Sequence, residues 1–312
     1  MNTPNSQNNT NKAHKIFKIV FLSFVGAGIL LTLIAFSIYG FNFNRVWADI
    51  TNEANFELVE LKNEKLEGAT AFDIRVDNAT ITIQTSATGE FGFKYNFDTE
   101  SSKVERAEVV DGTFIFVKTQ TFSFVSVLRP LSLGENRVTL TVPFDFDGQI
   151  TAFSKNGQIN ASNLNNLGMI KAETDNGRLE ISNSTIAFVE TKTQNGQIRL
   201  NNVTAQAINA TTINGTINFS SVTANRAEMK NQNGQNRVSG STINHLVATV
   251  SNGTNNIELR GRTGDYFISM STRNGTSRLN NNSFSGQRGL ENRDNLSVTL
   301  SSHNGSNRLT FI

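Results

Sequence analysis

Histidine and cysteine are scarce or absent in this 312-residue chain, and its acidic side chains do not cluster in the sequence. Histidine occurs only at His14, His245 and His303, and cysteine is absent, which excludes disulfides and thiolate metal sites. Acids are scattered: Asp175 alone directly precedes an Asn-Gly dipeptide, and no acidic pair recurs as general acid/base catalysis would require. Calcium-binding glycine-aspartate repeats, phosphate-binding glycine loops and a Ser-His-Asp order do not stand out. We therefore predict no catalytic residue, cofactor or metal, and no enzyme.

Four arginines are the exception to this scatter. Each lies three residues after the glycine of an Asn-Gly dipeptide, and Asn218 and Asn256 hold the same place elsewhere; the arginines are Arg199, Arg237, Arg278 and Arg308. If the repeats stack, these four, the arginine column, form a strip suited to charge-assisted hydrogen bonds with an anionic envelope polymer or headgroup. The alternative interpretation is a solvated face that keeps stacked strands soluble.

The Asn-Gly dipeptide itself recurs through the second half of the chain. Its spacing is 20, 19, 19, 19, 19, 22 and 30 residues, and a period near twenty is typical of repeat architectures. The predicted turns are Asn156–Gly157, Asn176–Gly177, Asn195–Gly196, Asn214–Gly215, Asn233–Gly234, Asn252–Gly253, Asn274–Gly275 and Asn304–Gly305.

Hydropathy alternates on both sides of each turn. Four residues after the glycine the side chain is always apolar, and its predecessor is always polar; the apolar set is Ala161, Ile181, Leu200, Phe219, Val238, Ile257, Leu279 and Leu309. Period two predicts strands with one buried face. Each unit therefore reads as a strand, an Asn-Gly corner where both residues tolerate positive φ, a second strand and a looser return.

Two architectures fit this pattern. A meander would close an antiparallel hairpin at each Asn-Gly, whereas a β-solenoid would use it as the corner of a coil. The constant step of 19 residues favours the solenoid, because parallel stacking needs coils of equal length and lets the asparagines form an amide ladder. We predict an all-β solenoid over residues 68–312, with regular two-strand coils of about 19–20 residues from 150 and loops at Gly261–Asp265 and Ser283–Asn295.

Two columns of polar residues bear on the stability and the function of this predicted solenoid. Two residues after the glycine, isoleucine and leucine give way to Asn236, Asn255, Ser277 and Asn307, so we expect a less apolar and less stable C-terminal half. An ice-binding alternative rests on Thr174, Thr193 and Thr212, but parity points these threonines inward.

The N-terminal part predicts a membrane anchor. Residues 1–18 read as a basic disordered tail, and Ile19–Tyr39 is an uncharged apolar run long enough to cross a bilayer, with basic residues before it that keep the N-terminus cytoplasmic. A cleaved signal peptide is the alternative. Residues 40–67 read as a juxtamembrane linker, with a short helix or spacer over Glu57–Lys65, and the aromatic strand patterns from Phe72 to Val142 as irregular coils that cap the rod.

The charge balance beyond residue 45 and the last strand indicate which binding partners to expect. Four basic residues and no acids lie in 1–45, which leaves 24 basic and 26 acidic residues beyond and argues against nucleic-acid binding. Thr310–Ile312 is expected to end the stack with an exposed strand edge at which copies of the chain self-associate.

One stretch carries a family resemblance. Residues 137–143 read Arg-Val-Thr-Leu-Thr-Val-Pro, and 154–159 read Ser-Lys-Asn-Gly-Gln-Ile. This arrangement resembles the bacterial "putative adhesin" β-strand-repeat family, a domain of unknown function in envelope proteins, over roughly residues 68–312. The resemblance implies an extracytoplasmic stacked-strand domain after a membrane helix, without established catalytic residues. High asparagine content and the long final insertion depart from the family pattern.

The leading functional expectation is a membrane-anchored, outward-facing binding or scaffold module that contacts an envelope or surface polymer. The alternatives are a non-enzymatic accessory or sensor subunit of an envelope-stress system that acts on a membrane protein and, less favoured, a carbohydrate-active enzyme. The expected partners are the lipid bilayer through Ile19–Tyr39 and an anionic wall polymer or a membrane protein.

Overall fold

The computed structural model describes residues 56–61, 65–66, 68–98, 102–120, 136–284, 286–288 and 296–312. All of them belong to one compact unit, which comprises Asn55–Thr121 and Gly134–Ile312. The expected tail at 1–18 and the expected span at Ile19–Tyr39 lie outside the described residues. Within the described ranges, no helix is both long and apolar enough to traverse a bilayer.

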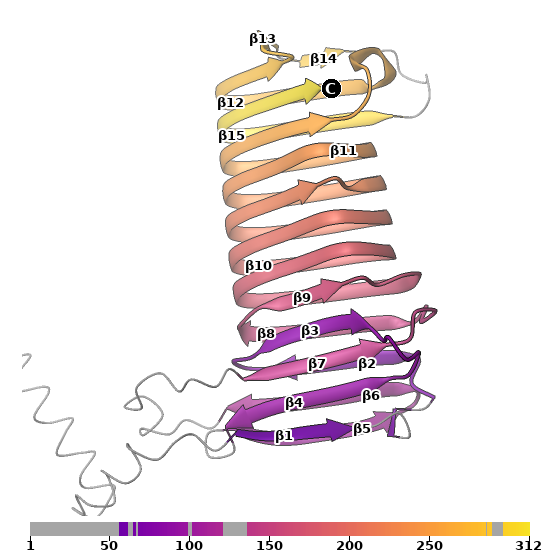
Figure 1. The fold of residues 1–312 in the computed structure, drawn as a ribbon. Coiled ribbons are helices and arrows are strands. Elements are labelled where there is room, and N and C mark those ends of the chain that lie inside the picture. The colour runs from indigo at the N-terminus through magenta and orange to yellow at the C-terminus, as the bar shows by residue number, and fades with distance from the viewer. Residues whose placement is uncertain are drawn as a thin grey trace, which may run out of the picture. The chain divides into compact units, whose positions relative to one another are not determined.

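The central part of the unit is a parallel β-solenoid, as predicted (Figure 1). It consists of β8 (Gln149–Asn156), β9 (Ile159–Ser162), β10 (Leu167–Ser220) and β11 (Thr223–Leu259). Residues 19 apart pair in parallel: Ala210 with Met229, Asn214 with Asn233, and Phe219 with Val238. Each residue thus lies beside its counterpart in the next coil, a register that hairpins at Asn-Gly would not produce.

The return segment of each coil is also strand, which corrects the expected two-strand coil with a loose return. Thr204 pairs with Thr223 and Ala205 with Ala224, and β10 continues through several corners without interruption. The reason is a second alternation: Val203 and Ala205 are buried, whereas Thr204 between them is exposed. The backbone hydrogen bonds of the return are therefore satisfied by neighbouring coils, as buried backbone requires.

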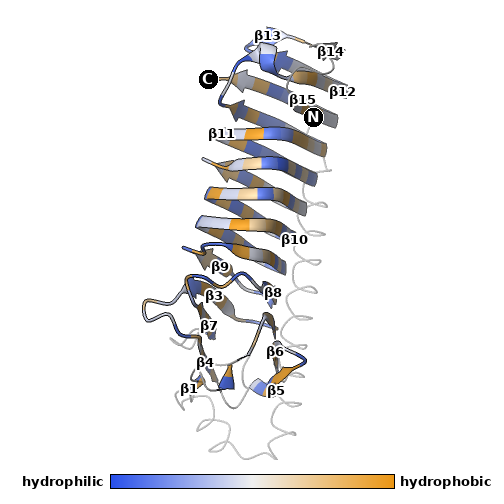
Figure 2. Cartoon of the chain, turned by 90° about the vertical axis from the view of Figure 1, so that its right-hand side faces the viewer, coloured by the Kyte–Doolittle hydropathy of each residue, from blue (hydrophilic) through white to orange (hydrophobic). Residues whose placement is uncertain are grey.

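The core is a set of apolar columns along the coil axis. One coil buries Val189, Ile198, Leu200 and Val203, and the other regular coils bury apolar residues at the positions of Val189 and Leu200 in one continuous cluster. Figure 2 shows hydrophobic and hydrophilic residues alternating along β10 and β11. Each buried Leu, Ile or Val contributes about 1.5–3 kcal/mol. Because one coil cannot bury its own inner face, this stabilisation comes from stacking.

The Asn-Gly corner has a different physical basis from the one expected. None of the turn asparagines has positive φ, so the dihedral argument fails for them. The glycine is required because a Cβ at Gly215 would lie 1.8 Å from the carbonyl oxygen of Gly196, one coil away, and the φ of Gly215 is +144°. The other corner glycines meet the same obstruction, with the first neighbouring atom at 1.6–2.1 Å.

The turn asparagines instead form the outer amide ladder. Each Nδ2 donates to the Oδ1 of the neighbouring coil; Asn214 reaches Asn195 at 2.8 Å and Asn233 reaches Asn214 at 3.0 Å. Two residues outside the Asn-Gly repeats extend it, because Asn156 donates to Asn78 at 2.7 Å and Asn78 donates to Gln120. The expected ladder is thus confirmed and is longer than the repeats alone.

A second corner, which we did not predict, follows seven residues after each of the first five turn asparagines. Its residues share φ values of +49° to +56°, a region in which asparagine and glycine are enriched; they are Asn163, Asn183, Asn202, Ser221 and Gly240. Asn202 donates to Asn183 at 3.0 Å. The recurring asparagine at this spacing was a signal that could have indicated the corner.

The polar column of the C-terminal half forms the inner amide ladder. Asn236, Asn255 and Asn307 are at most 1% exposed. Asn236 donates to Asn255 and Asn255 to Asn307, each at 2.8 Å, and Asn307 donates to Ser277 at 3.2 Å. Asn255 also donates to the carbonyl oxygen of Ser301 at 2.9 Å. These bonds offset the burial of polar groups that made this half look less stable.

This ladder yields a prediction for two substitutions. Asn255→Leu keeps the approximate side-chain volume but removes the Nδ2 donor that Asn307 Oδ1 and the Ser301 carbonyl oxygen accept from. We therefore expect the free energy of unfolding to fall by about 2–4 kcal/mol. Asn236→Ile copies Ile217 of the preceding coil and takes one donor from Asn255 Oδ1, but it also removes an Oδ1 that has no partner, so we expect a smaller fall of about 1–2 kcal/mol. Urea unfolding of both variants checks this; equal losses would contradict it.

The final coils are not stacked in chain order. β12 (Phe267–Leu279) follows β11 in sequence, but β15 (Ser297–Phe311) lies between the two. β15 pairs in parallel with β11 on one side and with β12 on the other, as Figure 1 shows. The expected exposed edge at Thr310–Ile312 is therefore wrong: Phe311 pairs with Leu259, and the amide of Ile312 donates to the carbonyl of Leu259 at 2.9 Å.

Antiparallel strands cover β12 at this end. β13 (Asn282–Ser283) and β14 (Gly286–Arg288) both pair with β12. The expected loop at Gly261–Asp265 contains a short 3₁₀ turn, Thr263–Asp265, and the expected loop at Ser283–Asn295 includes β14. Short strands thus pair with both ends of β12, at Ile268–Met270 and at Arg278–Leu279, and short covering strands are a common way of blocking strand addition.

The opposite end repeats this displacement. β2 (Ala71–Val76) lies between β6 (Thr113–Gln120) and β8, and β3 (Thr80–Thr85) lies between β7 (Arg137–Val142) and β9. Antiparallel strands close this end as well: β4 (Gly92–Asp98) pairs with β7, β1 (Phe56–Leu61) with β4, and β5 (Ser102–Val110) with β6.

The aromatic segment caps the stack, as expected. The folded unit begins earlier in the chain than the expected residue 68. Phe93 packs against Phe114 and Phe116 with ring centroids 4.9 and 4.8 Å apart. Because Phe56–Leu61 is a strand of this cap, the expectation of a helix or spacer over Glu57–Lys65 is wrong there. The sheet begins before residue 68.

Candidate binding surface

The arginine column lies on the strands that follow the Asn-Gly corner. Strand register places Asn218 beside Arg237, Asn256 beside Arg308, and Arg308 beside Arg278. The spatial order thus differs from the chain order, since the displaced β15 brings Arg308 between Asn256 and Arg278. Neighbouring strands are about 4.8 Å apart, so Arg308 and Arg278 are adjacent positive charges.

These charges are not neutralised by the described part of the chain. Arg237, Arg278 and Arg308 are exposed, and no arginine of the column forms an ion pair with a described residue. Arg237 donates only to Gln235 at 3.3 Å, and the half-buried Arg199 has an Nε without a described partner. Like charges on neighbouring strands are destabilising, so an anion at this face would relieve a local repulsion.

The face before the corner differs in that it carries ion pairs. Lys171 Nζ lies 3.3 Å from Glu173 and 3.3 Å from Glu190, and Lys230 lies 2.7 Å from Glu228. Hydrogen bonding with Glu173, then with Glu190, raises the pKa of Lys171. Several charges there are mutually paired, whereas Lys192, Arg226 and Arg273 on the same face form no ion pair with a described residue.

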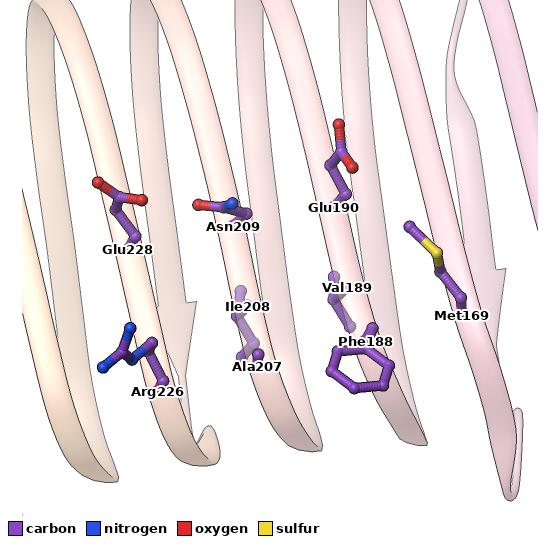
Figure 3. A pocket seen from close by; sticks show the side chains of 9 residues that line it. All are labelled: Met169, Phe188, Val189, Glu190, Ala207, Ile208, Asn209, Arg226 and Glu228. Carbon is purple, nitrogen blue, oxygen red and sulfur yellow. The ribbon is translucent and has the colours of Figure 1, made fainter.

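A shallow hollow of about 410 Å³ lies on the face before the corner. In Figure 3, the side chains of Met169, Phe188, Ala207 and Arg226 stand on successive coils, and those of Glu190, Asn209 and Glu228 form a neighbouring row. Phe188 is 50% exposed, which is unusual for an aromatic side chain on a regular coil. We did not predict this hollow, although its column could be read seven residues before each turn asparagine.

The other residues considered for chemistry lie apart. His245 Nδ1 is 3.1 Å from Ser297 Oγ, and Asp175 accepts a hydrogen bond from Gln194 at 2.8 Å. His303 is exposed beside a corner, and His14 lies outside the described residues. Across the described ranges, no three His, Cys, Asp or Glu side chains are placed to hold a metal ion. The threonine column points inward as expected, and Thr174, Thr193 and Thr212 are at most 2% exposed, which removes the surface that ice binding needs.

Comparison with known proteins decides the family. The family model described as Toastrack DUF4097 matches residues 69–310, most of the chain and all of its regular coils. The chain belongs to the Toastrack DUF4097 family. The resemblance to the "putative adhesin" repeat family is thereby confirmed. No curated protein matches this Toastrack chain.

Solved structures share the Toastrack fold at low identity. A "putative adhesin" from Parabacteroides distasonis has a TM-score of 0.51 and 8% identity, covering 83% of this chain and 98% of its own. One from Parabacteroides merdae has a TM-score of 0.50 and 10% identity, covering 83% and 96%. A "putative lipid binding protein" from Parabacteroides distasonis has a TM-score of 0.50 and 11% identity, covering 83% and 97%. Such likeness establishes the fold alone.

Proposed function

We propose that this Toastrack domain is a non-enzymatic binding module that holds an anionic envelope or surface polymer along the arginine column. The observation that carries the proposal is the row of guanidinium groups on one face, none of which forms an ion pair with a described residue. Arginine donates in a planar fork that suits carboxylate and phosphate groups. A polymer lying along the coil axis would meet several such forks in turn.

Three further points support a binding role. Structures of the same fold are described as a "putative adhesin" and a "putative lipid binding protein", names that concern binding rather than reaction. The expected membrane span at Ile19–Tyr39 would hold the domain outside the cell, where anionic polymers lie. The alternating asparagines Asn218 and Asn256 add neutral donors and acceptors between the charges.

The test is a charge-removal experiment on the full chain. Arg278→Ser with Arg308→Ser should weaken binding to polygalacturonate or poly(glycerol phosphate) at least about tenfold, since each charge-assisted hydrogen bond contributes about 1.5–3 kcal/mol. Binding of the parent should also fall as salt rises, and that salt dependence should flatten in the variant. Dextran, which carries no charge, should bind neither protein through this face.

A matched control separates position from net charge. Lys192→Ser with Arg273→Ser removes two positive charges from the face before the corner, where both residues are exposed and outside the described ion pairs. This variant should bind the polyanion within about twofold of the parent. If both double variants lose binding equally, or if neither loses it, the arginine column is not the site.

A further inference from the structure

The hollow on the face before the corner has the dimensions of a gap for one flat ring. Ala207 lies on the coil between Phe188 and Arg226, and strand register pairs Ala207 with Arg226 (Figure 3). Coils are about 4.8 Å apart, so the coils of Phe188 and Arg226 are about 10 Å apart. Because alanine carries only a methyl group, a space remains between the phenyl ring and the guanidinium.

The floor of this gap is apolar and firmly held. Val189 and Ile208 beneath it are 3% and 2% exposed and belong to the core cluster. Met169, on the coil beyond Phe188, widens the apolar area. A ring seated on Ala207 would be at van der Waals distance, about 3.5–4 Å, from carbon atoms of the floor and of Phe188.

The rim offers hydrogen-bonding groups in a neighbouring row. Asn209 pairs with Glu228 across the strands, and Glu190 stands on the next coil (Figure 3). Carboxylate oxygens accept, the guanidinium of Arg226 donates, and the amide of Asn209 does both. Within the described ranges, the side chains of Asn209 and Arg226 have no hydrogen bond or ion pair, so both are available.

We infer that this hollow is a subsite for one neutral pyranose sugar ring. A sugar presents C–H groups on its faces and hydroxyls at its edge, which match the Phe188 and Ala207 walls and the rim of acceptors and donors. An alkyl chain would leave the rim groups desolvated without partners. The subsite lies on a different face from the arginine column and does not depend on it.

The experiment titrates the full chain with neutral trisaccharides, namely maltotriose, cellotriose and chitotriose, using saturation-transfer NMR. At least one should bind with a dissociation constant of millimolar order, as expected for a single shallow subsite. Ala207→Leu fills the gap and should abolish the signal, and Phe188→Ser should weaken binding about tenfold. Phe188→Ser stands as the second variant if Ala207→Leu does not fold.

Controls make each outcome decisive. Val247→Ser changes another exposed apolar residue of the same face, 38% exposed and outside the hollow, and should leave binding unchanged. The double variant of Arg278 and Arg308 should also bind the sugar normally, so failure of the polymer proposal leaves this one intact. The inference is overturned if no neutral trisaccharide binds at about 20 mM, well above a millimolar dissociation constant. Retained binding in Ala207→Leu and Phe188→Ser, or binding of decyl chains in place of sugar, overturns it as well.

Discussion

Replacing Gly215 by alanine should destabilise the solenoid by more than about 3 kcal/mol, the largest effect we expect from any single substitution. The added Cβ would lie 1.8 Å from the carbonyl oxygen of Gly196 and 2.9 Å from its carbonyl carbon. Both are backbone atoms of the adjacent coil, so no side chain can move aside. The φ of +144° adds strain for any residue with a Cβ.

The clash can be relieved only by separating two coils, and separation breaks the outer amide ladder. Asn214 precedes Gly215 and holds Asn195 on one side and Asn233 on the other. In a stack whose stability is a sum over neighbouring coils, such a break in the middle isolates two shorter stacks. We expect the thermal midpoint, measured by circular dichroism, to fall by at least about 8 °C, or a transition that splits in two.

Gly264→Ala is the matched control. Nothing lies within 4 Å of a Cβ built on Gly264, and its φ is outside the left-handed region. The same chemical change there should leave the midpoint within about 1–2 °C of the parent. A Gly215→Ala protein as stable as Gly264→Ala would show that the coils can part at a corner without penalty.

Removing residues 297–312 should have the second large effect, because β15 is an interior coil. Its loss leaves β11 and β12 about 10 Å apart, each with an unpaired face. Leu246, Ile257, Ile268 and Leu279, all at most 4% exposed, would lose the apolar neighbours that β15 provides. We expect hydrogen-exchange protection of residues 267–279 to be lost, together with proteolysis in this region.

Complementation sharpens this test. A synthetic peptide of residues 297–312 should bind the truncated chain and restore protection of β12, because it supplies parallel pairing on both sides. The same peptide with Gly305→Val should fail, since Gly305 lies where a Cβ would come within 1.6 Å of the Gly253 carbonyl oxygen. If truncation leaves β12 protected without peptide, then β12 can pair directly with β11, and β15 is dispensable.

The repeats encode the shape of each coil but not the order in which the end coils stack. The period of Asn-Gly sets coil length, corner position and side-chain parity, so the register and the buried columns were predictable. The order of the end coils was not, because every coil carries the same columns: Asn274 and Asn304 are equally able to pair with Asn252. The longer intervals before Asn274 and Asn304 were the only signal that the order of these coils departs from the chain order.

Of the two candidate surfaces, the arginine column could be predicted from the sequence and the hollow was not. The arginine column followed from position alone, although its spatial order needed the structure. The sequence did not predict that Asn78 and Gln120 belong to the outer amide ladder, because neither residue precedes a glycine. The hollow depends on a small residue between two large ones on adjacent coils, and this becomes visible only when Phe188, Ala207 and Arg226 are compared as neighbours rather than as members of separate repeats.

The interior position of β15 also bears on how the protein is made. A ribosome completes β12 at Leu279 and the end of β15 only at Phe311, roughly 2–6 s later at about 5–20 residues per second. During this interval the nascent β12 has no native partner on its inner side, and the gap beside β11 stays open to any extended chain. Chaperone demand during biosynthesis should therefore be concentrated between the synthesis of β12 and that of β15, and a stop codon shortly before Ser297 should release a chain prone to aggregate.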